Sequence, residues 1–490
     1  MKLRTAPAFA GAAVASLALP ASAMADSLDA ASNGVLGETV AINTLWVTIA
    51  AVLVLLMLAG LLCLEAGMSR MKNVGTLVPK ALISMAVAGL AYYAVGFAFA
   101  FGNGDIIGST GFLLRDYGDP QEAFGIMGLS DALIESKWLF QFAFCAVCLA
   151  IAWGSTLERI KFHAHAIFAL VFAAFIYPLA SHWVFGGGWL QTNVGMQDFA
   201  GSTAVHLVGA TAALAGLLVL GPRRGKYGAD GTPRPIPGHS MFILGLGMFI
   251  LLFGWFGFNA GSALGVTDGR FAEVAMVTMI GASGGILGAY LTTVVLQRTV
   301  DIGMVCNGLV AGLVAITAGS GYVENWAAVP IGLIGGMLVV PSIMLIDKKL
   351  DDPVGVLSAH GIAGIWGTLA CGIFTSPRFA QYAAIGDPDG GLVYSGAFTQ
   401  LGYQALGVVV IFALVLTLSF ITFKAIAMTI GLRASEDAEI AGLDIAEHGM
   451  YGYPEQFISD AELYGPAVPA SIKLNGHAPA PAGSAEAAPA

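Results

Sequence analysis

Long apolar runs separated by short polar segments dominate the pattern of this chain. Eleven of the runs are long enough to cross a bilayer as helices, which takes about 20 predominantly apolar residues. They cover approximately residues 45–68, 76–101, 138–155, 164–184, 200–221, 239–261, 271–297, 302–319, 327–346, 355–376 and 402–432. The pattern predicts an all-α polytopic membrane protein with eleven transmembrane helices, the last of them long.

The composition agrees with this prediction. Of the 490 residues, 57% are hydrophobic and 11% are charged, whereas an ordinary globular protein carries about 25% charged residues. The 65 glycines suit membrane helices, because small residues let helices pack closely where lipid offers no hydrophobic drive. The net charge of −10 gives no sign of a nucleic-acid partner.

The two ends of the chain differ from its apolar middle. Lys2 and Arg4 precede an apolar stretch and a small-x-small sequence ending at Ala25, which predicts a cleavable signal peptide, with an uncleaved anchor as the alternative. The last residues are rich in Ala and Pro and are expected to be disordered. The expected domains are a signal peptide (1–25), a membrane domain (26–432), a cytoplasmic regulatory tail (433–465) and a disordered tail (466–490).

Basic residues indicate how the helices are oriented. A signal peptide places the mature N-terminus outside the cell, in the periplasm of a bacterium, and eleven spans then place the C-terminus in the cytoplasm. Cytoplasmic loops of membrane proteins are enriched in Lys and Arg. The loops expected inside carry Arg70, Lys72, Arg159, Lys161, Arg223, Arg224, Lys226, Arg234, Arg298, Lys348 and Lys349, and those expected outside carry Arg115, Lys137, Arg270 and Arg378. This asymmetry supports a multi-pass protein of the bacterial inner membrane, with its N-terminus outside and its C-terminus inside.

Two of the expected helices contain the same phrase, an aspartate followed eight residues later by a histidine. Asp198 precedes His206, and Asp352 precedes His360. Eight helical residues rise about 12 Å, close to the roughly 15 Å half-thickness of the bilayer core, so both histidines are expected near its midplane. The topology makes helices 1–5 and 6–10 two inverted five-helix repeats, whose related histidines would meet in one pore.

Motifs of enzymes and cofactor sites are missing from the sequence. It contains no Gly-x-Ser-x-Gly, His-Glu-x-x-His or phosphate-binding loop motif, so we expect no enzyme, no cofactor and no metal site. The five cysteines all fall in apolar segments. The pair Cys145-x-x-Cys148 lies within a membrane span, where packing explains it better than redox chemistry.

Several short phrases occur in order between about residues 40 and 457. They are Glu65-Ala-Gly with Lys72-Asn73, Phe140-Gln-Phe-Ala-Phe144, Glu158-Arg-Ile, Asp198-Phe-Ala-Gly with His206, Gly254-Trp-Phe-Gly-Phe-Asn-Ala-Gly-Ser262, Asp351-Asp-Pro with His360-Gly, and Gly442-Leu-Asp with His448-Gly449. In their joint order and spacing these phrases resemble the ammonium transporter family (the Amt/Mep/Rh superfamily), on its bacterial and plant Amt side.

The resemblance implies an outer site that recruits the ammonium ion. It assigns this site to Ser262, Phe144 and an aromatic side chain at Phe185, since aromatic faces attract cations and a hydroxyl accepts an N–H hydrogen bond. Asp198 would hold the outer end of its helix through hydrogen bonds and attract cations at longer range. The family usually has tryptophan where this chain has Phe185 before three glycines. Either Phe185 or Trp183 would complete the site.

The resemblance also implies a gate and a pore below this site. Phe144 and Phe258 would form a stacked gate that strips water from the ion. Beyond it, His206 and His360 would line a narrow channel, with Trp255 packed beside them. Two neutral imidazoles that share a hydrogen can fix each other's tautomer, accept a proton from ammonium and relay it.

Other polar residues have simpler expected roles. Asp352 precedes a proline and is expected to be a helix N-cap. The role of His182, near the outer mouth, stays open. We expect solvated or interfacial positions for Glu158, Arg159, His163 and His165 at the cytoplasmic side.

The sequence therefore predicts a protein for nitrogen uptake that moves NH4+/NH3 across the membrane. The resemblance implies a homotrimer whose segment 431–448 docks under neighbouring subunits and meets a PII-type signal protein. An ammonium receptor of the same fold and a Rh-like channel for neutral NH3 or CO2 are the alternatives. Whether NH4+, NH3 with a relayed proton, or NH3 alone crosses stays open.

Overall fold

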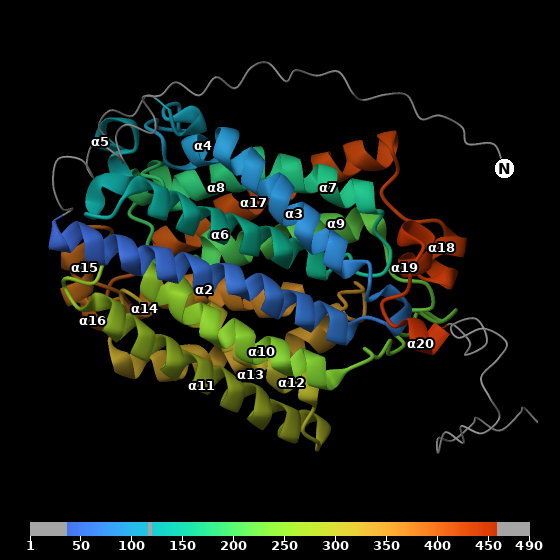
Figure 1. The fold of residues 1–490 in the computed structure, drawn as a ribbon. Coiled ribbons are helices and arrows are strands. Elements are labelled where there is room, and N and C mark those ends of the chain that lie inside the picture. Colours follow the sequence, from blue (N-terminus) through green and yellow to red (C-terminus); the bar gives the residue numbers. More distant parts are fainter. Residues whose placement is uncertain (1–36, 116–119, 458–490) are drawn as a thin grey trace, which may run out of the picture.

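The computed structural model describes residues 37–115 and 120–457 (Figure 1). The expected signal peptide (1–25) and disordered tail (466–490) lie outside the described residues. Within the described ranges the fold is all-helical, since residues in extended conformation pair only in isolated bridges. The prediction of an all-α fold is confirmed.

The helices run in sequence through one elongated bundle (Figure 1). Its α-helices are α2 (Glu38–Met68), α3 (Leu77–Ala91), α4 (Phe97–Phe101), α5 (Pro120–Ala123), α6 (Ile134–Gly154), α7 (Phe162–Val171), α8 (Tyr177–Val184), α9 (Val208–Leu220), α10 (Met241–Trp255), α11 (Arg270–Gln297), α12 (Ile302–Thr317), α13 (Ala328–Ile346), α14 (Ala363–Phe374), α15 (Pro377–Ala383), α16 (Leu392–Ser395), α17 (Thr399–Thr429), α18 (Glu436–Ala441), α19 (Leu443–His448) and α20 (Pro454–Phe457). Its 3₁₀ turns are η1 (Met71–Asn73), η3 (Phe112–Leu114), η4 (Gly125–Leu129) and η9 (Asn325–Ala327). Its π-helical turns are η2 (Tyr92–Gly96), η5 (Phe172–Ile176), η6 (Leu190–Val194), η7 (Ser202–Leu207), η8 (Phe256–Ala260) and η10 (Leu357–Ile362).

The membrane-length helices agree closely with the expected spans. Ten helical segments of the described residues are long and apolar enough to cross a membrane. Most begin and end within a few residues of an expected span, although α2 begins at Glu38 rather than 45. The expected span 302–319 forms α12, which has 16 residues and is shorter than the other ten.

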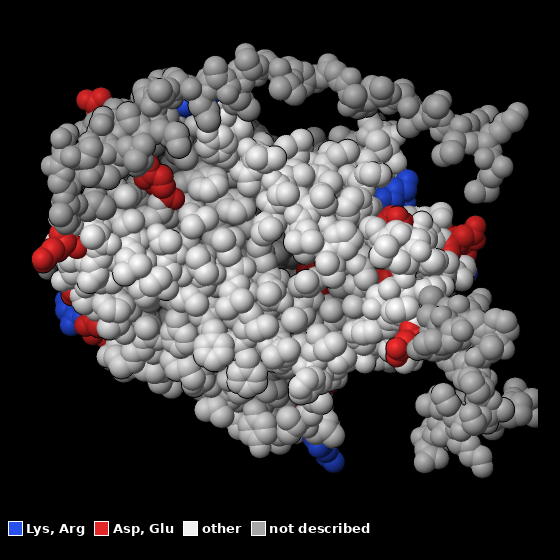
Figure 2. Space-filling model, in the orientation of Figure 1, with Lys and Arg blue, Asp and Glu red and all other residues white. Residues whose placement is uncertain are grey.

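Charged side chains lie at the two ends of the bundle, and the flank between them is almost uncharged in the view of Figure 2. One end, called the tail end below, carries α18, α19 and α20 (Figure 1). The opposite end, called the loop end, carries α5, α15 and α16. An uncharged band between two charged ends is the surface expected of a protein embedded in a bilayer.

Glycines bring three helices into close contact on one side of the bundle. A side-chain carbon built onto Gly285 of α11 would lie 2.4 Å from the Cα of Gly312 of α12. One built onto Gly336 of α13 would lie 2.0 Å from the carbonyl oxygen of Gly285. Any larger residue at these positions would push the helices apart, which explains part of the high glycine content.

The polar tail folds back onto its own chain. The Asp444 carboxylate accepts hydrogen bonds from the backbone N–H groups of Gly75 and Thr76, both at 2.8 Å. Lys72 donates to the carbonyl oxygen of Glu439 at 2.8 Å. These contacts hold α18 and α19 against the turn between α2 and α3.

A buried ion network closes the tail end, and it corrects one prediction. Glu158 and Arg159 are 2% and 0% exposed, so they are not interfacial anchors. Arg223 lies between the carboxylates of Asp351 at 2.9 Å and Glu158 at 3.6 Å, and Arg70 donates to Glu158 at 2.8 Å. Burial opposes the charge of Glu158, but Arg70 and Arg223 hold its pKa below the usual value.

Candidate functional site

The two histidines of the repeated phrase meet inside the bundle. His206 lies on η7 and His360 on η10, and they are 0% and 5% exposed. Their Nδ1 atoms are 3.1 Å apart, within hydrogen-bonding distance. The Nε2 atom of His206 is buried and has no hydrogen-bond partner in the described part of the chain. A buried nitrogen of this kind is free to bind a small polar molecule.

Three of the candidate residues sit on π-helical turns, which the sequence did not predict. His206 lies on η7, Phe258 on η8 and His360 on η10. A π-turn rotates the side chains away from their regular helical positions, and such turns recur at functional sites. Apolar periodicity carries no signal for one extra residue in a turn, so only the backbone reveals them.

Asp198 holds the backbone at the start of η7. Its two carboxylate oxygens accept hydrogen bonds from the N–H groups of Gly201, Ser202, Thr203 and Ala204, at 2.7, 3.0, 2.8 and 2.9 Å. Gly201 has a φ of 116°, a conformation that favours glycine. Burial raises the pKa of Asp198 to about 6, and the four N–H groups limit the rise.

Asp352 plays the matching part before η10. Its carboxylate accepts a hydrogen bond from the N–H of Leu357 at 2.8 Å and another from the hydroxyl of Ser155 at 3.0 Å. Burial raises the pKa of this carboxyl group also. The two repeated aspartates therefore both bind the backbone of the turn that carries a histidine.

Two phenylalanines close the loop-end side of the histidine pair. The rings of Phe144 and Phe258 stack with centroids 4.0 Å apart and planes 6° apart. Both side chains are fully buried, at 1% and 0% exposure. The Phe258 ring lies 5.4 Å from the His206 ring. Because the two rings stack in contact, no water-filled path runs between them.

The residues of the expected outer site lie beyond this stack. The edge of Phe185 faces Phe144, with ring centroids 6.5 Å apart. The Ser262 hydroxyl donates to the carbonyl oxygen of Phe258 at 2.9 Å, so its own lone pairs can still accept a hydrogen bond. Trp183 donates instead to Ile106 at 2.8 Å. Among these aromatic residues Phe185, rather than Trp183, is the neighbour of the Phe144 ring.

Trp255 braces the histidine pair from the side. Its ring stacks on His206 with centroids 5.1 Å apart, and its indole N–H donates to the hydroxyl of Thr317 at 3.0 Å. The sequence gives no sign of this role for Thr317, because a threonine within an apolar run carries no distinctive signal.

A small cavity lies on the tail-end side of the pair. It encloses about 20 Å³, enough for about one water molecule. We call it the inner cavity. Its lining includes His360, Asn307, Gly154, Leu61 and Ala150.

Two further histidines are buried, and one of them corrects a prediction. His165 was expected to be solvated, but it is 3% exposed, stacks on Trp153 and contacts the Ser84 hydroxyl at 2.6 Å. His182 places Nδ1 3.0 Å from the carbonyl oxygen of Ala100 and Nε2 2.8 Å from that of Gly104. Through these two contacts His182 ties the end of α8 to the segment that contains Ala100 and Gly104.

The described residues contain no group of three or more His, Cys, Asp or Glu side chains that could hold a metal ion. Instead, membrane-length helices surround a buried histidine pair, a closed aromatic stack and a small inner cavity. A fold and a site of this kind define a polytopic membrane channel or transporter for a small solute.

Comparisons with known proteins identify the family. The profile of the Ammonium Transporter Family matches residues 45–453. Ammonium transporter Amt2 of Archaeoglobus fulgidus is 39% identical over 434 residues, covering 86% of this chain and 90% of that protein. Ammonium transporter Amt1 of Haloferax mediterranei is 36% identical over 441 residues, covering 86% and 80%. The chain belongs to the ammonium transporter family, whose named relatives are transporters rather than enzymes.

Solved structures agree with this assignment. A structure described as a sensor Amt protein has a TM-score of 0.76 and 33% identity, covering 84% of this chain and 99% of that one. Mep2 from Candida albicans has a TM-score of 0.75 and 28% identity, covering 86% and 92%. The shared fold therefore extends over most of the chain.

Proposed function

We propose that this chain takes up NH4+/NH3 across a bacterial inner membrane through one pore in each subunit. The observation that carries the proposal is the contact between His206 and His360, with Nδ1 atoms 3.1 Å apart inside an apolar bundle. An ionisable pair at this depth is costly in a membrane and is retained where it serves a pathway.

The contact between the two Nδ1 atoms limits the protonation states. One histidine must carry a hydrogen on Nδ1, while the other must accept it there. In the neutral pair, the first ring then has a lone pair on Nε2 and the second ring has an N–H on Nε2. The pore thus offers one acceptor and one donor, which suits ammonia, a molecule that both donates and accepts hydrogen bonds. Moving the shared hydrogen reverses the two roles and provides a route for a proton.

The aromatic stack serves as the gate of the proposed pore. A cation that reaches Phe144 and Phe258 must lose its water before the rings let it pass. Ammonium can replace that water with N–H hydrogen bonds and can deprotonate to neutral ammonia, whereas potassium and sodium can do neither. Selection therefore rests on hydrogen-bond chemistry, which ions of similar charge cannot imitate.

Ser262, Phe144 and Phe185 form the proposed recruitment site at the loop end. The Ser262 hydroxyl would accept an N–H hydrogen bond, and the two rings would attract the cation through their faces. Asp198 stays bound to its four backbone N–H groups and would act at longer range. A phenyl ring attracts cations less strongly than an indole, so the site is expected to bind ammonium weakly.

The proposal includes the topology and the assembly. Eleven helices, with α12 as the short one, would form two inverted five-helix repeats, with the tail end in the cytoplasm and the mature N-terminus outside. A homotrimer and a PII-type protein docking at the tail are the expected partners. Residues 433–457 offer a folded surface for that docking, since α18 and α19 are held by Asp444 and Lys72.

The deciding experiment records currents from purified protein in liposomes after a jump in ammonium, with potassium jumps as the control. We expect a saturable current specific to ammonium. His206→Ala and His360→Ala should assemble but lose at least about tenfold in ammonium-over-potassium selectivity, because each leaves a buried nitrogen without its partner. His163→Ala, at an exposed histidine, is the matched control. Unchanged selectivity in both pore variants would refute the histidine mechanism.

Two alternatives correspond to other outcomes of the same experiment. Alkalinisation of the liposome interior without current would indicate a Rh-like channel for neutral NH3. Ammonium binding with neither signal would indicate an ammonium sensor, a role that the name of one similar structure makes worth testing.

A further inference from the structure

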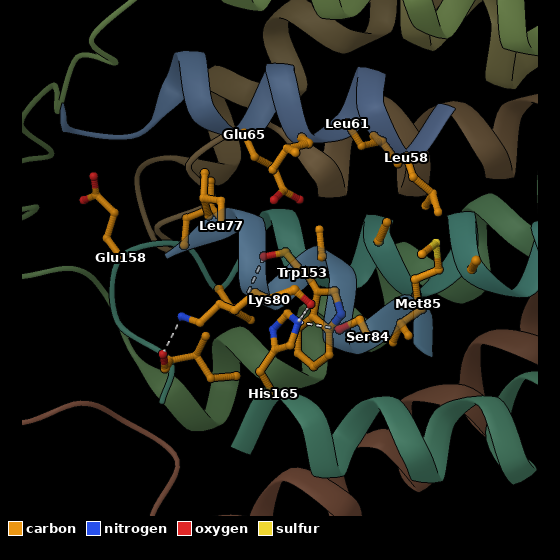
Figure 3. Close-up of a pocket in the computed structure, with 18 residues that line it drawn as sticks. Leu58, Leu61, Glu65, Leu77, Lys80, Ser84, Met85, Trp153, Glu158 and His165 are labelled. Atoms are coloured by element: carbon orange, nitrogen blue, oxygen red, sulfur yellow. Dashed lines mark hydrogen bonds between the residues drawn. The ribbon is translucent and has the colours of Figure 1, made fainter. Parts of the chain in front are cut away.

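A second cavity, larger than the inner cavity, lies between α2, α3, α6 and α7 toward the tail end (Figure 3). It encloses about 50 Å³, room for about three to five water molecules. We call it the side cavity. Figure 2 shows this flank hollowed, with an acidic side chain visible inside the hollow. The polar side chains of its lining are Glu65, Lys80, Ser84, Trp153, Thr156, Glu158 and His165.

Glu65 is the exceptional residue of this lining. Its carboxylate points from α2 into the side cavity (Figure 3) and makes no hydrogen bond or ion pair within the described residues. The nearby Lys80 does not neutralise it directly, because its ammonium group donates to the carbonyl oxygen of Ile160 at 2.9 Å. A carboxylate without a partner inside an apolar span is costly, so the group either takes up a proton or binds a cation that stabilises its ionised form.

Other polar atoms of the lining also lack partners. The indole N–H of Trp153 and Nδ1 of His165 are buried without a hydrogen bond within the described residues. Nε2 of His165 lies 2.6 Å from the Ser84 hydroxyl and 3.2 Å from the carbonyl oxygen of Lys80, so Nε2 makes both contacts of the ring and Nδ1 is left without a partner. The side cavity thus combines a carboxyl group, an indole N–H donor and an unpartnered ring nitrogen, a polar set that suits water and a small cation rich in N–H groups.

The side cavity lies next to the end of the proposed pore. Leu61 and Ala150 line both the side cavity and the inner cavity that contains His360. Gly154 lines the inner cavity, and a side-chain carbon built onto it would lie 3.8 Å from Oε1 of Glu65. The Glu65 carboxyl group therefore lies beside the wall of the inner cavity.

We propose that Glu65 forms an exit site for ammonium, which binds the cation in the side cavity as it leaves the pore at the tail end. This inference rests on the proposed function and adds a residue to it. A negative charge at this point lowers the free energy of the departing cation where the apolar pore ends, and water in the cavity restores its hydration. Glu65 also lies three residues before the end of α2, about 5 Å along the helix axis, so the released ion is close to the aqueous side.

The test compares wild type with Glu65→Gln, which keeps the shape of the side chain but removes its charge. We expect the maximal ammonium current to fall by at least about tenfold, the effect of losing one charge-assisted hydrogen bond. The ammonium concentration that gives half-maximal current from the loop end should not change. Glu65→Asp should keep most of the current. Glu135→Gln, at an exposed glutamate of α6, is the control and should behave as wild type.

Infrared difference spectra of the same proteins, with and without ammonium chloride, provide a readout that a structural role would not change. We expect ammonium to shift a carboxylate band of wild type that is missing in Glu65→Gln. An unchanged maximal current, or a current that falls while no carboxylate band responds to ammonium, overturns the proposal. If Glu65→Gln does not fold, the comparison is made between wild type and Glu65→Asp. A carboxylate band that responds to ammonium in both proteins, at a different frequency in Glu65→Asp, supports the proposal, and the absence of such a band overturns it.

The two proposals fail in different ways. Wild type without any ammonium-driven current or alkalinisation contradicts the proposed transport function. The infrared band still reports whether ammonium binds at Glu65 in that case.

Discussion

Replacing Asp198 by Asn tests how the loop end of η7 is held together. The side chain keeps one oxygen, which can still accept from two of the four backbone N–H groups. Its new NH2 group faces the N–H groups of Thr203 and Ala204, which then lose their acceptor. Two hydrogen bonds to a charged group contribute about 3–6 kcal/mol together.

The buried charge of Asp198 partly offsets this loss. Its pKa rises from 3.8 to about 6 in the folded protein, so the ionised form costs the folded state about 3 kcal/mol at pH 7. Because the folded protein holds the proton of Asp198 more tightly than the unfolded chain does, protonation of this residue stabilises the fold. This stabilisation is complete below pH 3.8 and is lost as the pH rises through about 6. Asp198→Asn should therefore lower stability by about 0–3 kcal/mol at pH 7.

The difference in the free energy of unfolding between wild type and Asp198→Asn should be larger in acid. Between pH 7 and pH 4.5 wild type gains about 2 kcal/mol from the protonation of Asp198, and the variant does not. Thermal or denaturant unfolding of detergent-solubilised protein at the two pH values measures this difference, with the exposed Asp389→Asn as control. A stability difference that is the same at the two pH values, or larger at pH 7, would refute the assignment of Asp198 as a buried acid with a raised pKa.

Activity measured beside stability separates the two effects of this residue. Asp198→Ala removes both oxygens, so we expect it to lose most of the ammonium current and to unfold at a lower temperature. A variant that keeps its unfolding temperature but loses current would assign Asp198 mainly to long-range attraction of the cation.

Three further changes test the gate, the ion network and the tail. Phe258→Ala should cost about 3–5 kcal/mol of stability and lower the ammonium-over-potassium current ratio, because it opens the aromatic stack; an unchanged ratio would exclude this ring from the gate. Glu158→Gln should cost about 3–5 kcal/mol at pH 7, because it leaves Arg223 partly unpaired. The pKa of Glu158 is lowered in the fold, so the stability that its charge contributes is present above its ordinary pKa and is lost as the pH falls through its folded pKa. Unfolding scans should therefore show a smaller difference in stability between Glu158→Gln and wild type at pH 4 than at pH 7. Asp444→Ala should release the tail from Gly75, which faster proteolysis of residues 433–457 would reveal; equal cleavage rates would mean that other contacts hold it.

Much of the fold could be predicted because a bilayer imposes strict lengths. A helix that crosses about 30 Å of hydrocarbon must be long and apolar, so the spans appear as runs in the sequence. The environment of residues at the ends of the spans could not be predicted in this way. His165, Glu158 and Arg159 were expected to be solvated or interfacial, but partners from distant segments help to bury them: Ser84 contacts His165, and Arg223 pairs with Glu158.

The candidate site could be predicted only in part. The repeated aspartate–histidine phrase led to His206 and His360, because an ionisable residue within an apolar run is conspicuous. The π-turns, the partner of Trp255 and the side cavity at Glu65 could not be predicted. Each depends on how the backbone adjusts when helices pack, and that adjustment leaves no mark in the spacing of apolar residues.

The sequence by itself determined that this chain enters a membrane and where most of its helices begin and end, because the free energy of moving apolar side chains into lipid depends on each segment alone. The tertiary structure decided which side chains meet. His206 and His360 are 154 residues apart in the chain, yet their Nδ1 atoms lie 3.1 Å apart. Such a contact depends on the packing of several helices at once, since shifting any one of them by a single residue would turn the two rings away from each other.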